Sequence, residues 1–155
     1  MVKEYNPIED MPDYANWVLA ADAGTFGFVD YVHAQVLRGG ITADVLGAIV
    51  GWLWPEFVEE DGSIILASST DKFLRLKSQG LPDIEIEYWC NFTNIDGILP
   101  GLPVSFGAYL AGVIRDMWCA KLHNDFPGKK FVVEVVELLE QNEFSVTFRQ
   151  HEGDS

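Results

Sequence analysis

Three residues with reactive side chains, Asp116, Cys119 and His123, stand three and then four positions apart in the segment "GVIRDMWCAKLHNDF". This spacing would bring them to one side of an α-helix. Two kinds of chemistry use such groups. A carboxylate, a thiolate and an imidazole can bind a metal ion, and an imidazole beside a cysteine can activate the sulfur as a nucleophile.

The surrounding sequence favours neither chemistry. No zinc motif has this trio at these offsets. A catalytic cysteine also needs donors that stabilise an oxyanion, and an exposed helix interior does not supply them. The simpler interpretation is an amphipathic helix in which Lys121 and His123 stabilise the negative end of the helix dipole. We therefore expect no catalytic or metal site here, and a small enzyme using Asp116, Cys119 and His123 stays an alternative.

A second group of candidates combines two tryptophans with carboxylates in the segment "GWLWPEFVEEDG", and Glu85 and Glu87 in "DIEIEYWC" add a further acidic set. Tryptophan supplies contact area at interfaces, and carboxylates pair with lysine or arginine. These segments predict a surface that binds a basic protein, made of Trp52, Trp54, Glu56, Glu59, Glu60, Asp61, Glu85 and Glu87. The alternative is that the tryptophans complete the core while the acids solvate a hairpin tip and a sheet face.

The net charge bears on the kind of partner. The chain has 24 acidic and 10 basic side chains, a formal net charge of −14 and a pI near 4.3. Such a field repels phosphate backbones and attracts cations, so we expect a basic protein partner and no nucleic acid. A high charge also serves solubility alone, and that interpretation stays open.

Several functional classes lack their sequence signatures. There is no glycine-rich phosphate loop and no nucleophile elbow, and we expect no cofactor and no metal. No basic leader followed by an apolar run begins the chain, and no stretch is long enough to span a bilayer. Cys90 and Cys119 match no zinc or redox spacing. We expect a cytoplasmic protein without a membrane partner.

Hydropathy periodicity and turn residues predict the elements that position these side chains. Helices are expected over 14–21, 26–38 and 42–53, the last capped by Thr42 and ended by Pro55. Asp61-Gly62 is typical of a β-hairpin turn, and "STDKFLRLKSQG" of a short helix. The alternation in "DIEIEYWCNF" predicts a strand with Glu85 and Glu87 on one solvent face.

The last third predicts a long helix over 104–123 and then two strands joined around Gln141-Asn142. The apolar arc of this helix contains Phe106, Tyr109, Leu110, Val113, Ile114, Met117 and Trp118. The order predicts an α+β fold in which N-terminal helices pack with a mainly antiparallel sheet of about five strands. We expect a single domain over 1–155, with flexible ends at about 1–7 and 150–155.

Charge and aromatic–acidic adjacency together favour one function. The expected protein is an acidic cytoplasmic binding protein that neutralises or regulates a basic partner, most concretely an immunity-type inhibitor of a cationic toxin. Besides the enzyme alternative, a structural subunit of a homo-oligomer remains open because the mean hydropathy is +0.08.

Overall fold

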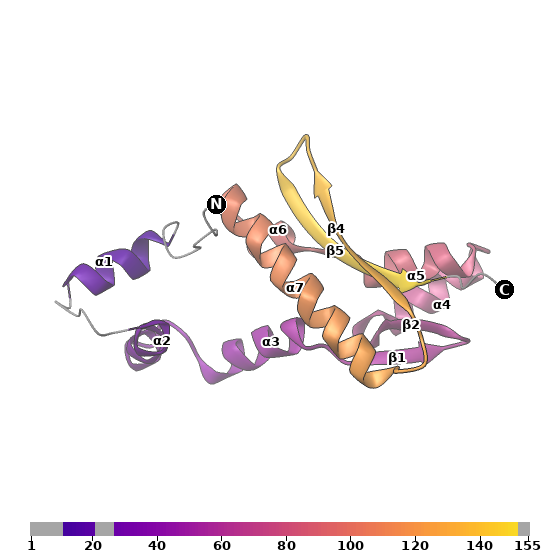
Figure 1. Cartoon of the computed structure of the whole chain (residues 1–155), viewed down its shortest axis with the longest axis horizontal. Helices are drawn as coiled ribbons and strands as arrows, with labels where there is room; N and C mark the ends of the chain where they lie inside the picture. The colour runs from indigo at the N-terminus through magenta and orange to yellow at the C-terminus, as the bar shows by residue number, and fades with distance from the viewer. Residues whose placement is uncertain (1–10, 21–26, 152–155) are drawn as a thin grey trace. The chain divides into compact units, whose positions relative to one another are not determined.

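A computed structural model describes residues 11–20 and 27–151, which contain seven α-helices and five strands (Figure 1). The α+β class and the C-terminal hairpin after a long helix are confirmed. The strands form two separate antiparallel sheets, of two and three strands, rather than one sheet of five. The expected flexible ends lie outside the described residues except for Gln150, which ends a strand, and His151.

Contacts divide the chain into two compact units, Met1–Val50 and Gly51–Ser155. The first unit holds three predicted helices, and all three are confirmed within the described residues: α1 (Pro12–Ala20), α2 (Phe28–Leu37) and most of α3 (Ala43–Leu53). The ring of buried Tyr14 contacts Phe28 and Tyr31 at centroid distances of 4.7 and 5.4 Å. The hydroxyl of Thr42 accepts the Val45 N–H at 3.3 Å, as its predicted capping role requires.

The second unit begins with the predicted hairpin, β1 (Phe57–Glu60) and β2 (Ser63–Leu66). Its turn residues Asp61 and Gly62 have φ angles of 49° and 87°, the left-handed region that two-residue hairpin turns require. The next helix, α4 (Thr70–Ser78), also forms as predicted. It ends shortly before Gly80, which has a φ of 75°.

The predicted strand in "DIEIEYWCNF" is wrong, because this segment forms helix α5 (Asp83–Asn91). Its buried residues are Ile86, Glu87, Cys90 and Asn91, a spacing with helical rather than twofold periodicity. Two of these buried side chains are polar, so hydropathy alone hides the helical pattern. Acidic residues in the first turn, Asp83 and Glu85, also suit the positive end of the helix dipole.

The second sheet has the order β3-β5-β4 and is built from β3 (Thr93–Asn94), β4 (Phe131–Leu138) and β5 (Glu143–Gln150). A short helix that the sequence did not predict, α6 (Ile95–Ile98), follows β3. The predicted turn between β4 and β5 is confirmed, and Asn142 in it has a φ of 51°. Strand β5 is therefore central in this sheet, and both of its faces pack against helices.

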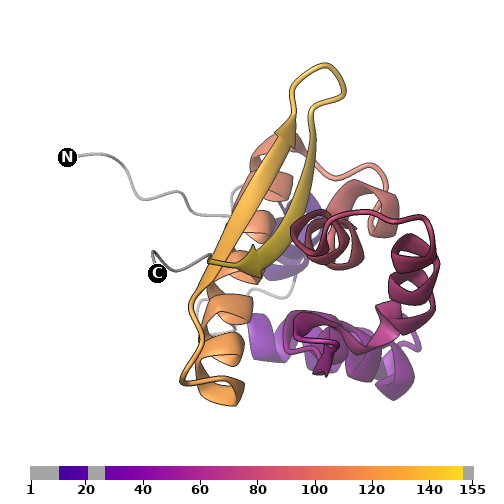
Figure 2. The same ribbon diagram turned by 90° about the vertical axis from the view of Figure 1, so that its right-hand side faces the viewer.

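Helix α7 (Val104–Asp125) covers one face of the β4–β5 hairpin, and α5 contacts β5 from the other side (Figure 2). The α7 residues that are buried against this face are Gly107, Ala111, Ile114, Trp118 and Leu122. The predicted apolar arc was therefore partly wrong, since Tyr109 is 40% exposed. A Cβ atom at Gly107 would lie 3.1 Å from the ring of Phe144, so glycine permits this close helix–strand approach.

Two polar side chains of α5 join the two sheets. Asn91 accepts the Leu66 N–H at 2.9 Å and donates to the carbonyl oxygens of Ile64 and Phe148 at 3.0 and 3.2 Å. One turn earlier, Glu87 accepts the Ile64 N–H at 2.8 Å and the Gln150 N–H at 2.7 Å. These backbone groups belong to the edge of β2 that faces away from β1 and to the edge of β5 that faces away from β4, beyond its short pairing with β3. The α5 side chains therefore replace a missing strand at both edges.

We predict that Asn91→Ala lowers the free energy of unfolding by about 3 kcal/mol, because it leaves buried backbone groups of β2 and β5 without partners. Urea unfolding followed by tryptophan fluorescence measures the change. Asn124→Ala is the matched control at an exposed position and should change the stability by less than about 0.5 kcal/mol. Equal losses in the two variants would contradict the bridging role of Asn91.

Candidate partner-binding site

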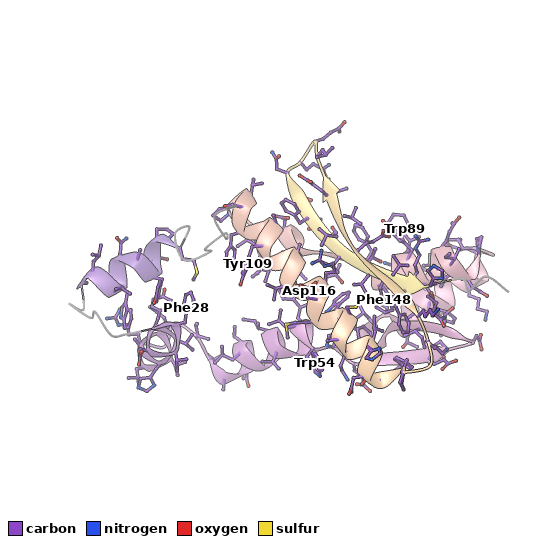
Figure 3. The ribbon with its side chains drawn as sticks, viewed as in Figure 1. Phe28, Trp54, Trp89, Tyr109, Asp116 and Phe148 are labelled. Carbon is purple, nitrogen blue, oxygen red and sulfur yellow. The ribbon has the colours of Figure 1, made fainter. Side chains whose placement is uncertain are left out.

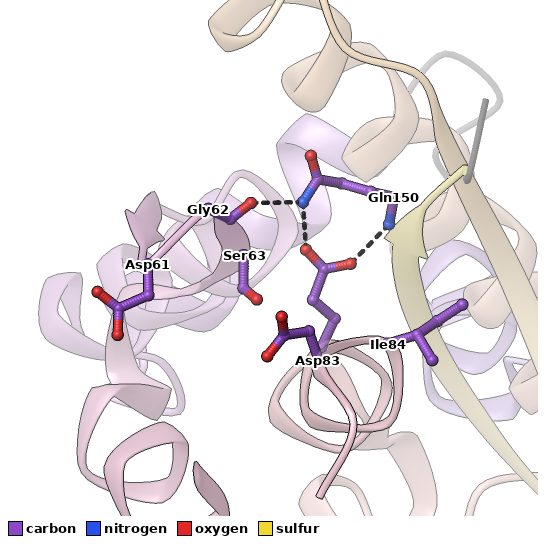
Figure 4. A pocket seen from close by; sticks show the side chains of 7 residues that line it. Asp61, Gly62, Ser63, Asp83, Ile84 and Gln150 are labelled. Atoms are coloured by element: carbon purple, nitrogen blue, oxygen red, sulfur yellow. Dashed lines mark hydrogen bonds between the residues drawn. The ribbon is translucent and has the colours of Figure 1, made fainter. Parts of the chain in front are cut away.

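An acidic pocket opens where the β1–β2 turn, the start of α5 and the end of β5 meet (Figure 4). It has a volume of about 260 Å³. The residues that line it are Asp61, Gly62, Ser63, Asp83, Ile84, Glu87 and Gln150. Three of them are carboxylates and none is a lysine or arginine, so the pocket concentrates negative charge within a small volume.

The carboxylate of Glu87 forms the inner part of this pocket and is 3% exposed. Its Oε1 accepts the Ile64 N–H at 2.8 Å and the side-chain amide of Gln150 at 2.5 Å, and its Oε2 accepts the Gln150 backbone N–H at 2.7 Å. All three donors are N–H groups, which matches a carboxylate acting purely as an acceptor. Glu87 has no cationic partner among the described residues, so hydrogen bonds alone hold it.

Gln150 closes the pocket from the end of β5. Its side-chain amide donates to the Gly62 carbonyl at 2.8 Å as well as to Glu87, and Figure 4 draws both bonds. The hairpin turn, α5 and β5 are thereby linked through one amide group. This linkage fixes the distance between the turn and the helix, and so the width of the pocket.

Two polar groups in the pocket are free to bind a ligand. Ser63 is 3% exposed, and its hydroxyl has no hydrogen-bond partner among the described residues. Asp83 is exposed in the first turn of α5, and its carboxylate also forms no hydrogen bond or ion pair within the described part of the chain. Both side chains face the space of the pocket (Figure 4). Ser63 is thus a buried residue whose hydroxyl oxygen can be reached only from the pocket.

Among the predicted acids of the hairpin segment only Asp61 lines this pocket, and these acids differ in their partners. Asp61, in the turn, forms an ion pair with Lys77, and Glu59 pairs with Lys129 at 3.0 Å. Glu60 is half-buried and Glu56 is exposed, and neither forms an ion pair among the described residues. Exposed pairs of this kind contribute little to stability, so a basic partner could compete for them.

The two predicted tryptophans have different environments. Trp52 is half-buried against the core, and its carbonyl oxygen accepts the indole N–H of Trp118 at 3.1 Å. Trp54 is 43% exposed, and the ammonium nitrogen of Lys121 lies 5.7 Å from the centre of its ring. Lys121 also donates to Asp125 at 2.5 Å, and this hydrogen bond holds the pKa of Asp125 below its ordinary value. Trp52 therefore serves the core, and Trp54 is already in contact with a cation.

The two predicted glutamates of α5 lie on different sides of the helix. Glu85 is exposed, whereas Glu87 is buried in the pocket, so the expected strip of two solvent-facing glutamates does not exist. The reason is the helix itself, since residues two apart face opposite sides of a helix but the same face of a strand. The structure thus brings Asp61 and Glu87 together in one pocket and places Glu85 outside it.

An aromatic cluster on α5 was missed by the sequence interpretation. Trp89 is 45% exposed (Figure 3), and its ring lies 5.1 Å from that of Tyr88 and 5.6 Å from that of Phe92. Glu85 precedes Trp89 by one helical turn. The run "EYWCNF" contained this signal, but the strand prediction concealed it. Asp83, Ser63 and Gln150 were also missed, and no sequence pattern marks them as neighbours.

The three reactive residues of α7 all lie on its exposed side (Figure 3 labels Asp116). Cys119 and His123 line a depression of about 350 Å³ together with Lys129, Lys130, Phe131 and His151. Asp116 does not line it and instead pairs with Arg115 at 2.7 Å. No hydrogen bond joins Cys119 to His123 in the described part of the chain. This geometry does not favour catalysis by the trio.

The described residues also bear on two other kinds of site, a metal site and a membrane span. Residues 11–20 and 27–151 contain no group of three or more histidine, cysteine or acidic side chains arranged to hold a metal ion. Within the same ranges no helix has the length and apolarity to cross a membrane.

Comparison with known proteins adds no further information, because no family model, curated protein or solved structure matches this chain.

We predict that the two free cysteines react at very different rates with a thiol reagent such as DTNB. Cys119 is exposed, whereas Cys90 is buried and burial raises the pKa of its thiol, which the charges of Lys72 and Arg75 only partly offset. One thiol of the native protein should therefore react quickly and the second only after unfolding. Cys119→Ser should remove the fast reaction; two equally fast thiols would contradict the burial of Cys90.

Proposed function

We propose that this protein is an acidic cytoplasmic binding protein that neutralises a basic protein, most concretely as an immunity-type inhibitor of a cationic toxin. The observation that carries the proposal is the acidic pocket, in which carboxylates from the hairpin turn and from α5 meet without a lysine or arginine in the lining. These carboxylates lie far apart in the sequence, so only the fold gathers them.

The binding face in this proposal consists of the pocket and the exposed acids around it. Exposed Glu59 and half-buried Glu60 lie on the hairpin whose turn lines the pocket, and exposed Glu85 lies in the first turn of α5, outside the pocket. The face binds lysine and arginine side chains that a cationic toxin would otherwise use to hold phosphate groups. Inhibition then results from occlusion of the toxin's own binding surface.

An aromatic anchor and the overall charge support the same function. Trp89 is 45% exposed and flanked by Tyr88, and partly exposed tryptophans of this kind are enriched at the centres of protein interfaces. The net charge of −14 steers a basic partner toward the face and raises the association rate. The free thiols of Cys90 and Cys119 fit a reducing compartment, which supports the cytoplasmic location.

The proposal predicts that charge reversal on the binding face abolishes partner binding. The full-length protein is first used as bait in lysate of its native cells at low and at physiological salt, and a basic protein retained at both is purified. The triple variant Glu59→Lys, Glu60→Lys, Glu85→Lys should weaken its Kd about a hundredfold or more, because three attractive charges become repulsive. Isothermal titration calorimetry measures the Kd, and an activity assay of the captured protein measures inhibition.

A control variant with the same change in net charge separates the contribution of the binding face to the Kd from the contribution of the protein's overall electrostatic field. The triple variant Asp116→Lys, Glu137→Lys, Glu140→Lys reverses three exposed acids of the same unit outside the proposed face. It should change the Kd by less than about tenfold and lower mainly the association rate. Equal effects of the two triple variants, or no effect of the first, would overturn the proposed face.

A further inference from the structure

We propose that the acidic pocket takes a single lysine ammonium group from the basic partner, held by Asp83, Ser63 and Glu87. The inference rests on the proposed function for its partner, but the pocket chemistry that it names can be tested without one. It makes the pocket a recognition site for one side chain, beyond the general attraction of an acidic face for a basic protein.

The hydrogen-bond acceptors of the pocket that have no donor indicate which chemical group would bind there. Glu87 has about four acceptor sites on its two oxygens, and three N–H groups already occupy three of them. One site on Glu87 therefore remains. The Asp83 carboxylate and the Ser63 hydroxyl oxygen form no hydrogen bond among the described residues, and both line the pocket.

An ammonium group fits this set of acceptors. It has three N–H donors, one each for Asp83, Ser63 and the remaining site on Glu87. A guanidinium binds best through two parallel hydrogen bonds to one carboxylate. The inner carboxylate, Glu87, cannot offer this pair because both of its oxygens are engaged, so only Asp83 at the exposed start of α5 could accept it. A metal ion is not favoured either, since the described residues provide no cluster of three ligating side chains.

The side chain of Ser63 is the independent sign of a ligand. The residue is 3% exposed, and its hydroxyl faces the pocket without a hydrogen bond to any described residue, so its oxygen is available to a donor that enters the pocket. Asp61, at the rim, already pairs with Lys77, so the chain itself places an ammonium group beside the pocket. The partner's lysine would occupy the inner position between Asp83 and Glu87, which no cation of the described residues fills.

The test uses Nα-acetyl-lysine methylamide as the probe, titrated into the full-length protein and followed by ¹H–¹⁵N NMR. The expected result is a saturable shift of the Gly62, Ser63 and Ile64 amides, with a Kd in the millimolar range. The neutral norleucine analogue, which lacks the ammonium, should bind at least about tenfold more weakly. The arginine analogue should also bind more weakly than lysine.

Variants of the pocket separate the contribution of its hydrogen-bond acceptors to lysine binding from that of the protein's overall negative charge. Asp83→Asn and Ser63→Ala should each weaken lysine binding, and together by about tenfold or more. Glu85→Gln removes the same charge as Asp83→Asn from the same helical turn but outside the pocket, and should change the Kd by less than about twofold. Ser63→Ala should leave the thermal midpoint unchanged or raise it, because the hydroxyl has no partner in the unliganded protein.

Three results would overturn the inference: shifts that do not saturate, equal binding of lysine and norleucine, or tighter binding of arginine. Its failure is distinct from failure of the proposed function. If the charge-reversed face loses the captured partner while the Asp83→Asn, Ser63→Ala double variant binds it normally, the function stands and the lysine pocket is wrong. If the probe binds as expected but no partner depends on the face, the pocket stands and the function is wrong.

Discussion

The fold of the second unit depends on two polar side chains one turn apart on α5. Glu87 and Asn91 satisfy backbone groups at the free edges of β2 and β5, which would otherwise be buried without partners. Each unpaired buried group would cost about 1–3 kcal/mol, so the two small sheets can lie against the same helix only while these side chains are in place. Two short sheets thereby share one packed interior.

The same constraint creates the acidic pocket. To reach both sheet edges, Glu87 has to be buried with its negative charge held by N–H donors instead of a cation. The turn of the β1–β2 hairpin and the start of α5 then lie on either side of this carboxylate, which brings Asp61 and Asp83 to its rim. A structural requirement of the sheets therefore concentrates negative charge at one point on an already acidic protein, which is the physical basis of the proposed cation recognition.

The opposite side of β5 is stabilised by apolar packing. Phe148 lies edge-on to Phe57 and Trp118 at centroid distances of 5.0 and 6.1 Å, and α7 approaches closely because Gly107 has no side chain to meet Phe144. Hydropathy periodicity predicted the existence of α7, whereas turn residues and strand-forming side chains predicted the two hairpins. The hydropathy pattern wrongly included Tyr109 in the core face of α7. The small residues Gly107 and Ala111 lie in that face instead, and a hydropathy pattern does not show where a helix and a strand approach closely.

The sequence by itself determined the α+β class, the turns at Asp61-Gly62 and Gln141-Asn142, and the acidic charge, because each follows from local conformational preference or from composition. It did not determine α5, whose alternating residues were predicted to form a strand, nor the separation of the strands into two sheets. Only the tertiary structure decided these, since burial of Glu87 and Asn91 is favourable solely when distant backbone groups supply their hydrogen bonds. The pocket belongs to the same category: Asp61, Asp83 and Gln150 become neighbours through long-range contacts that no local pattern encodes.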